Sequence, residues 1–219
     1  MRRFLRNNGL TLVYMGLFLS TLAIMSMTGH REYNAEQVDH REPPVGYWTY
    51  LHTGHFVEGV FENWESEFLQ MGTYVLFTVF LFQKGSPESK PLDERTPQDV
   101  EAKRQRYPNP PWPARRGGAW LRVYANSLSI ALFALFVLSL ILHAVGGTWA
   151  HNEDQVAHGG APISMLHFVR TSEFWFQSMQ NWQSEFLAVA SLAFLGIYLR
   201  QHGSPESKPV AAPHEQTGS

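Results

Sequence analysis

The feature that most constrains this chain is an internal repeat with a spacing of 118 residues. Segment 63–69 reads Asn-Trp-Glu-Ser-Glu-Phe-Leu and returns at 181–187 as Asn-Trp-Gln-Ser-Glu-Phe-Leu. The heptapeptide Gly-Ser-Pro-Glu-Ser-Lys-Pro stands at 85–91 and, with the same spacing, at 203–209. Because the spacing does not change between these motifs, we infer a tandem duplication. Both halves are therefore expected to share one architecture.

Two long uncharged stretches predict membrane-spanning helices. Residues 10–28 follow a basic N-terminus, and residues 128–145 are their counterpart in the second half. Each stretch is long enough to cross a hydrocarbon core of about 30 Å as a helix. A cleaved signal peptide is disfavoured for the first stretch because its counterpart lies in the middle of the chain.

A second span is predicted in each half. Residues 29–62 form a polar loop whose pattern becomes helical from about Gly54, with apolar side chains returning at steps of three and four. The helical pattern continues into the apolar stretch 68–82, and the second half repeats it into 186–199. Tryptophans at the outer ends of these stretches are typical of membrane–water interfaces.

The predicted fold is all-α. Four transmembrane helices form two tandem two-helix repeats, related by a pseudo-twofold axis along the membrane normal. The predicted segments are the first membrane repeat at 1–92, a proline-rich cytoplasmic linker at 93–117, the second membrane repeat at 118–210 and a disordered tail at 211–219.

The distribution of lysine and arginine predicts the orientation. These residues are concentrated at the N-terminus, in and around the linker and at the C-terminal end, whereas the two histidine-bearing loops hold only Arg31, Arg41 and Arg170. By the positive-inside rule both termini and the linker are cytoplasmic, and the loops face outward.

The composition of the chain and its predicted apolar spans exclude several classes of function. The chain has no cysteine, which excludes disulfides and thiolate chemistry. The predicted spans carry no carboxylate, and we find no phosphate loop, nucleophile–base pair or nucleic-acid motif. The leading prediction is a membrane scaffold or accessory subunit without enzymatic activity. Its expected partners are the lipid bilayer and other membrane subunits or a second copy of the chain, and not nucleic acid.

A second hypothesis is a binding or transport module for a small solute or ion. Glu67 and Glu185 stand at the outer ends of the second spans, each four residues after an asparagine. A pseudo-symmetric polar site at the outer membrane–water boundary would use Asn63, Glu67, Asn181, Glu185, His40 and His158. The alternative is a structural role, with interfacial carboxylates held by loop amides.

A third hypothesis is a metal-dependent membrane enzyme. Four donors of the first half fall on one polar helix face, namely His52, His55, Glu58 and Glu62. Histidine and carboxylate donors suit zinc, manganese or iron. The second half has Arg170, Glu173, Phe176 and Gln180 at these positions, so such a site would be asymmetric. The alternative is a solvated amphipathic face without a cofactor.

The repeated heptapeptide also has two interpretations. Its glycines, Gly85 and Gly203, are expected to adopt the left-handed conformation that closes a helix, and the following proline prevents the helix from resuming. The other positions of the heptapeptide are identical in both copies either as a remnant of the duplication or because they form a cytoplasmic docking element that is used twice.

The motifs at 61–69 and 83–90 resemble those of a bacterial family of small integral membrane proteins of unknown function. The resemblance covers residues 1–92 and 118–210, and the second half departs from it where Gln180 and Gln183 replace Glu62 and Glu65. It implies a multi-pass protein of the bacterial plasma membrane, and it implies no activity.

Overall fold

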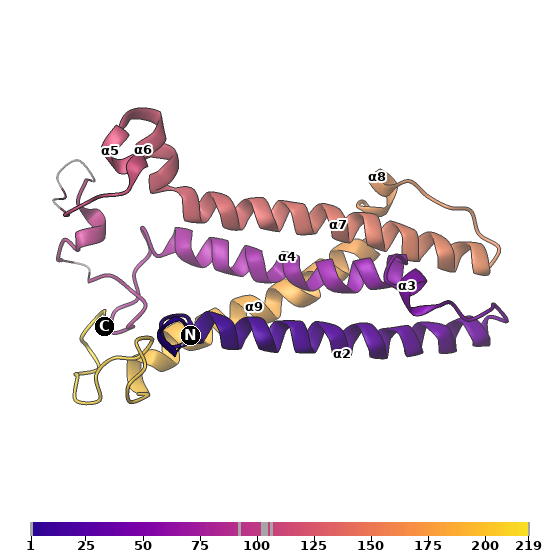
Figure 1. Ribbon diagram of the computed structural model, residues 1–219, viewed down its shortest axis with the longest axis horizontal. Coiled ribbons are helices and arrows are strands. Elements are labelled where there is room, and N and C mark those ends of the chain that lie inside the picture. Colours follow the sequence, from indigo (N-terminus) through magenta and orange to yellow (C-terminus); the bar gives the residue numbers. More distant parts are fainter. Residues whose placement is uncertain (1, 92, 102–104, 106, 219) are drawn as a thin grey trace. The chain divides into compact units, whose positions relative to one another are not determined.

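The computed structural model describes residues 2–91, 93–101, 105 and 107–218 (Figure 1). The regular structure of these residues is helical and includes no strand, which confirms the predicted all-α class. In chain order the elements are α1 (Arg2–Asn7), α2 (Gly9–Asp39), α3 (Tyr47–Tyr50), α4 (Gly54–Phe77), the 3-10 helix η1 (Pro97–Asp99), α5 (Trp112–Arg116), α6 (Gly118–Ala125), α7 (Ser127–Ala157), α8 (Met165–Phe168) and α9 (Ser172–Tyr198).

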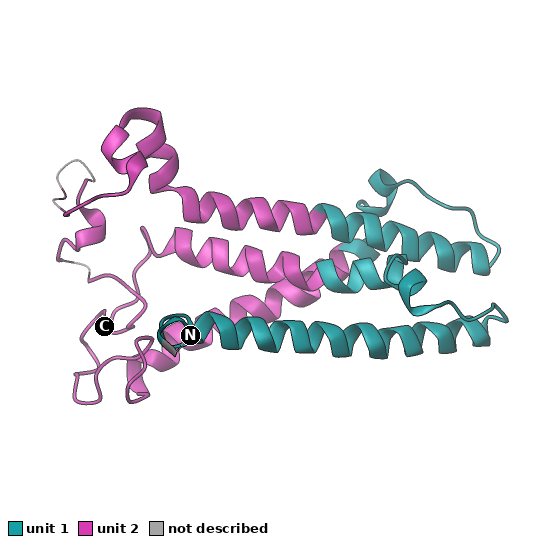
Figure 2. Ribbon diagram, viewed as in Figure 1, with its two compact units in different colours: residues 1–61, 141–174 teal, residues 62–140, 175–219 magenta. Residues whose placement is uncertain are grey.

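The chain folds into two compact units (Figure 2). Unit 1 comprises Met1–Phe61 and Ile141–Phe174, and unit 2 comprises Glu62–Leu140 and Trp175–Ser219. The units do not coincide with the sequence repeats, because each takes residues from both halves of the chain.

The helices follow the 118-residue spacing. Helices α2 and α7 both contain 31 residues and begin at Gly9 and Ser127. The short helices α3 and α8, and the starts of α4 and α9 at Gly54 and Ser172, keep the same spacing. The two repeats therefore fold into the same succession of elements.

Among the described residues, α2 and α7 are the helices long and apolar enough to cross a membrane. Both continue beyond their apolar stretches, so the predicted loop was wrong over residues 29–39, which are the last turns of α2. This segment has no proline and contains strong helix formers, such as Ala35, Glu36 and Gln37, which explains why the helix does not stop at the edge of the apolar stretch.

An asparagine fixes the return of the chain after each long helix. Asn34 accepts a hydrogen bond from the Val45 amide at 2.8 Å and donates one to the Val45 carbonyl at 3.1 Å. In the second repeat Asn152 makes the same pair of bonds to Ile163, at 2.7 and 3.0 Å. Each asparagine thus ties the loop back to the helix that precedes it.

Unit 1 is held together by aromatic rings packed on bare glycine backbone. A Cβ atom at Gly29 would lie 2.2 Å from the hydroxyl of Tyr50, and one at Gly147 would lie 2.6 Å from the ring of Phe168. Tyr50 is 2% exposed and Phe168 is fully buried. These two contacts are equivalent in the repeats, and they seat α3 on α2 and α8 on α7.

In unit 2, α4 and α9 end earlier than expected. The heptapeptide glycines have positive φ, 85° at Gly85 and 82° at Gly203, as predicted. However, α4 ends at Phe77 and α9 at Tyr198, several residues before these glycines. After Phe77 the amides of Val79 and Phe80 bond to carbonyls three residues back, a tighter turn that does not continue the α-helix.

We expect Gly54→Ala to destabilise the protein by about 1–3 kcal/mol. The added methyl group would lie 2.2 Å from the main-chain nitrogen of Ala150, which cannot rotate away as a side chain can. Thermal unfolding of the full chain in detergent measures the effect.

The matched control is Gly16→Ala, because no atom lies within 4 Å of the position of its Cβ. This variant should be neutral or more stable by up to about 1 kcal/mol, since alanine favours helix. If Gly54→Ala unfolds at the same temperature as Gly16→Ala, the close crossing at Gly54 is contradicted.

Candidate functional site

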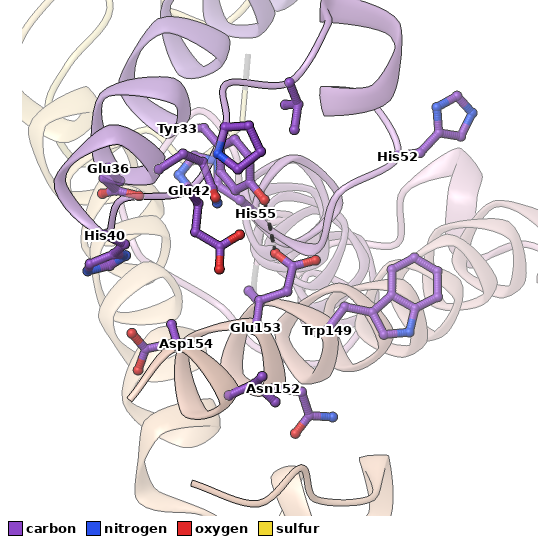
Figure 3. Close-up of a pocket in the computed structure, with 16 residues that line it drawn as sticks. Tyr33, Glu36, His40, Glu42, His52, His55, Trp149, Asn152, Glu153 and Asp154 are labelled. Atoms are coloured by element: carbon purple, nitrogen blue, oxygen red, sulfur yellow. Dashed lines mark hydrogen bonds between the residues drawn. The ribbon is translucent and has the colours of Figure 1, made fainter. Parts of the chain in front are cut away.

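Unit 1 contains a cavity of about 890 Å³ (Figure 3). Its walls come from the last turns of α2 and α7, the loop after α2, and the start of α4 with the turn before it. The carboxylates on these walls are Glu36, Glu42, Glu153 and Asp154, the imidazoles are His40, His52 and His55, and the amides are Gln37 and Asn152. Two aromatic side chains, Tyr33 and Trp149, also line the cavity.

The two long helices contribute equivalent residues to this cavity. Glu36 of α2 and Asp154 of α7 are separated by the repeat spacing and both line it. His40 and His158, which follow the two helices, are equivalent in the same way, and their ring centroids lie 5.5 Å apart. The structure therefore brings together two of the six residues predicted for a shared binding site.

A hydrogen bond between the two repeats lies on the cavity wall. The Tyr33 hydroxyl donates to Oε2 of Glu153 at 3.3 Å. Burial and the nearby Glu153 charge raise the pKa of Tyr33 to about 12, so the phenol keeps its proton at neutral pH. Desolvation also raises the pKa of Glu153, although the hydrogen bond from Tyr33 and the proximity of His55 act in the opposite direction. The Tyr33 ring lies 5.6 Å from that of His55, whose Nδ1 is 3.2 Å from the Tyr50 hydroxyl.

The cavity lining favours positive charge. It holds four carboxylates, and none of its described lining residues is lysine or arginine. A concave surface with one sign of charge concentrates ions of the opposite sign. Trp149 is 50% exposed and presents an aromatic ring on the same wall. An aromatic face next to carboxylates is a favourable environment for an organic cation.

The predicted metal site does not assemble. Helix α4 begins at Gly54, so His52 precedes the helix and does not share a helical face with Glu58 and Glu62. Figure 3 shows His52 standing apart from the other cavity side chains, and its Nδ1 lies 2.8 Å from the Trp48 carbonyl. Glu62 belongs to unit 2 and accepts a hydrogen bond from Asn181 at 2.6 Å. No group of three or more histidine, cysteine or carboxylate side chains in the described residues is arranged to hold a metal ion.

The other four predicted binding residues all lie in unit 2. Asn181 pairs with Glu62, whereas Asn63 and Glu67 are on the exposed side of α4. Glu67 lies close enough to Glu185 for their charges to repel. Of the six predicted residues, His40 and His158 thus belong to unit 1 and the asparagines and glutamates to unit 2.

Two further hydrogen bonds join α4 and α9 in unit 2. The Trp182 indole donates to Oε1 of the fully buried Glu65 at 3.1 Å, and the Gln70 amide donates to the Glu185 carbonyl at 3.0 Å. Glu62 and Glu65, which the second repeat replaces with glutamines, thus bind across to the other repeat. Each of these contacts uses one carboxylate, that of the first repeat, so the equivalent position of the second repeat can hold a glutamine.

The repeated heptapeptides form the same turn twice. In each turn the first serine accepts a bond from the glutamate amide, at 3.3 Å for Ser86 and 3.1 Å for Ser204. The second serine accepts an amide from six residues earlier, at 3.0 Å for Ser89 and 2.9 Å for Ser207. These bonds give the serines a structural role. The glycines have one as well, because the turn requires a positive φ at their positions.

The lysines of the two turns have different surroundings. Lys208 is 1% exposed, and its ammonium donates to the carbonyls of Gly85, Pro213, His214 and Gln216 at 2.6–3.3 Å. Its burial, and secondarily Arg200, lowers its pKa. Lys90 instead pairs with Asp99 of the linker at 2.5 Å.

The sequence predicts disorder for the tail at 211–219. In the structure the tail is held against the first turn by the Lys208 ammonium, by Thr217, which accepts a hydrogen bond from the Gly85 amide, and by the Gly218 amide, which donates to the Ser86 carbonyl. The lysine at the end of each turn thus binds the segment that follows it. We call the contacts of Lys208 with the tail the tail clasp.

Comparison with known proteins places the chain in a family. A family model described as "Domain of unknown function (DUF6766)" matches residues 1–219. The chain belongs to this family. No curated protein and no solved structure matches it. The family is uncharacterised, so the chemistry of the site has to be inferred from its residues.

We expect Lys208→Met to release the tail. The substitution removes three N–H donors that four main-chain carbonyls share, and the loss of each hydrogen bond costs on the order of 1 kcal/mol. Amide hydrogen exchange of the tail, at Gly218 in particular, should accelerate by at least about tenfold.

Lys90→Met is the matched control, since the same position of the first turn holds a surface ion pair. It should leave tail exchange unchanged, because exposed ion pairs contribute little. Equal protection of the tail in Lys208→Met and in the unmodified protein would refute the clasp.

Proposed function

We propose that the chain is an integral membrane protein whose unit 1 binds a small organic cation on the outward side of a bacterial plasma membrane. In this proposal α2, α4, α7 and α9 all span the bilayer, as two helix pairs related by a pseudo-twofold axis along the membrane normal. The composition of α2 and α7 and the shared helix boundaries of the repeats support this arrangement. The distribution of lysine and arginine supports cytoplasmic termini.

The observation that carries the binding function is the unit 1 cavity of about 890 Å³. A volume of this size is typical of sites for small molecules. A scaffold or accessory subunit, which was the leading prediction from sequence, needs no such cavity. The cavity therefore favours the second hypothesis, a solute-binding module, and it contains His40 from the residues predicted for it.

The lining residues suggest how the ligand is held. Trp149 supplies an aromatic face, whose attraction for a cation is about 0.5–2 kcal/mol. Glu36, Asp154 and Glu153 supply negative charge from both long helices. Tyr33, by donating to Glu153, keeps that carboxylate oriented on the wall. The proposal requires binding only and assigns no reaction to these groups.

We expect purified full-length protein to bind choline or putrescine more tightly than neutral molecules of similar size. Trp149→Ala and Asp154→Asn should each weaken binding by roughly tenfold, because each removes a cation-binding group from the cavity. Isothermal titration calorimetry in detergent measures both affinities.

Two side chains outside the cavity lining provide matched controls. Trp48 is an exposed tryptophan, and Asp39 is a carboxylate at the end of α2. Trp48→Ala and Asp39→Asn should leave the affinity unchanged. If the amines bind no better than the neutral molecules, or if the control variants lose as much affinity as the cavity variants, the proposed function fails.

Cation affinity should keep rising with pH above the range in which glutamates of ordinary pKa ionise. Partial desolvation raises the pKa of Glu153 above its usual value of 4.5, so this carboxyl ionises later and attracts the cation only above that range. The variant Glu153→Gln should bind more weakly at neutral pH and should lose this late part of the rise. An identical pH profile for Glu153→Gln and the unmodified protein would contradict the assigned role of Glu153.

A further inference from the structure

The segment before α7 carries exposed aromatic and basic side chains together. Residues 112–125, which form α5 and α6, are called the linker hairpin here. Its solvent-facing aromatic residues are Trp112, Trp120 and Tyr124, and its exposed arginines are Arg115, Arg116 and Arg122. The sequence has no aspartate or glutamate between 107 and 126, so no acidic side chain of the hairpin balances these charges.

Within α6 the apolar and basic side chains lie on different faces, whereas in α5 the Arg116 guanidinium lies over the Trp112 ring, 5.3 Å from its centroid. Trp120, Val123 and Tyr124 are spaced three and four residues apart, so they lie on one face of α6, with Arg122 on the other side. Trp120 is 53% exposed. Figure 1 shows α5 and α6 folded against each other, and the ring centroids of Trp112 and Trp120 are 5.3 Å apart. Val123 and Tyr124 of the same face are 57% and 44% exposed, so much of this face is accessible.

The hairpin leads directly into a predicted span. Helix α6 ends at Ala125, and Asn126 joins it to α7, with its side-chain amide donating to the Arg122 carbonyl at 2.8 Å. The apolar stretch of α7 begins at residue 128. If α7 enters a bilayer there, the C-terminal end of α6 lies within one helical turn of the bilayer surface.

The first repeat has an equivalent element in unit 1. Helix α1 precedes α2 and carries the exposed arginines Arg3 and Arg6 beside the exposed Phe4. At the junction the Asn8 side chain donates to the Phe4 carbonyl at 2.9 Å, the same bond that Asn126 makes to Arg122. Each repeat thus begins with a short basic and aromatic helix joined through asparagine to a long apolar one.

We infer that the linker hairpin binds the anionic lipid headgroups of the membrane surface at which α7 enters the bilayer. The inference rests on the proposed membrane location. Tryptophan and tyrosine rings favour the headgroup region, and the planar guanidinium group of arginine pairs with phosphate through two hydrogen bonds. Each arginine near an anionic surface shifts the equilibrium toward the bound state by roughly fivefold. Removal of all three should therefore shift it by on the order of a hundredfold.

The test uses the full chain, in which the absence of cysteine permits a fluorescent label at a single engineered thiol. Val123→Cys reports on the hairpin, and Leu135→Cys, at an exposed site of α7, reports on the span. The protein is placed in nanodiscs of phosphatidylcholine, alone or mixed with phosphatidylglycerol, with bromine on the acyl chains to quench a label that enters the bilayer.

The expected result is quenching of the Val123→Cys label in the mixed nanodiscs and weaker quenching in phosphatidylcholine alone. The variant with Arg115→Gln, Arg116→Gln and Arg122→Gln should lose the difference between the two lipids. A control with Lys84→Gln and Arg95→Gln, two exposed cations outside the hairpin, should retain it.

Two outcomes would overturn the inference, and they distinguish its own failure from failure of the proposed membrane location. If the Leu135→Cys label is quenched but the Val123→Cys label responds equally in both lipids or in neither, the hairpin does not recognise anionic lipid, although α7 does insert. If the Leu135→Cys label is itself unquenched, the membrane location fails, and the inference fails with it.

Discussion

The packing of a buried aromatic ring on a glycine underlies the structure of unit 1. Tyr50 meets Gly29, and Phe168 meets Gly147, at distances that leave no room for a Cβ atom. Burying such a ring stabilises the fold by about 1.5–3 kcal/mol, but only where the helix backbone is bare. The contact seats each short helix on a long one. It thereby sets the paths of the loops that form the wall of the unit 1 cavity.

Duplication supplied one architecture, and substitution then gave its two copies different chemistry. Glu36 and Asp154 kept their charge and both line the cavity, whereas Trp149 stands where the first repeat has Arg31. Replacing a cation by an aromatic ring on this wall favours the binding of a positive ligand. The two heptapeptide turns diverged less in sequence than in their partners. Lys208 is buried among main-chain carbonyls, whereas Lys90 pairs with Asp99.

The hydrogen bonds of the serines and the positive φ of the glycines bear on why the heptapeptide occurs twice. Most of its residues have a local structural task, so identity in both copies does not require a docking partner. Glu88 of the first turn accepts a hydrogen bond from Tyr74, and burial, with a smaller contribution from Glu206, raises its pKa. The turns therefore act as joints of unit 2, each of which holds the chain segment that follows it.

The sequence by itself determined the repeat, the all-α class, the two long apolar helices and the positive φ of Gly85 and Gly203, because periodicity, length and residue type are local properties. It could not show where α2 ends, because residues that favour a helix continue beyond the apolar stretch. It also misplaced His52 on a helix that begins two residues later. The repeat spacing predicted that His40 and His158 belong to one site, and it relates Glu36 to Asp154 in the same way. Only the tertiary structure decided that Trp149 and Glu153 line one cavity with Glu36, His40 and Asp154, and that Lys208 binds the tail. These contacts join residues far apart in the chain, and packing alone determines which of them meet.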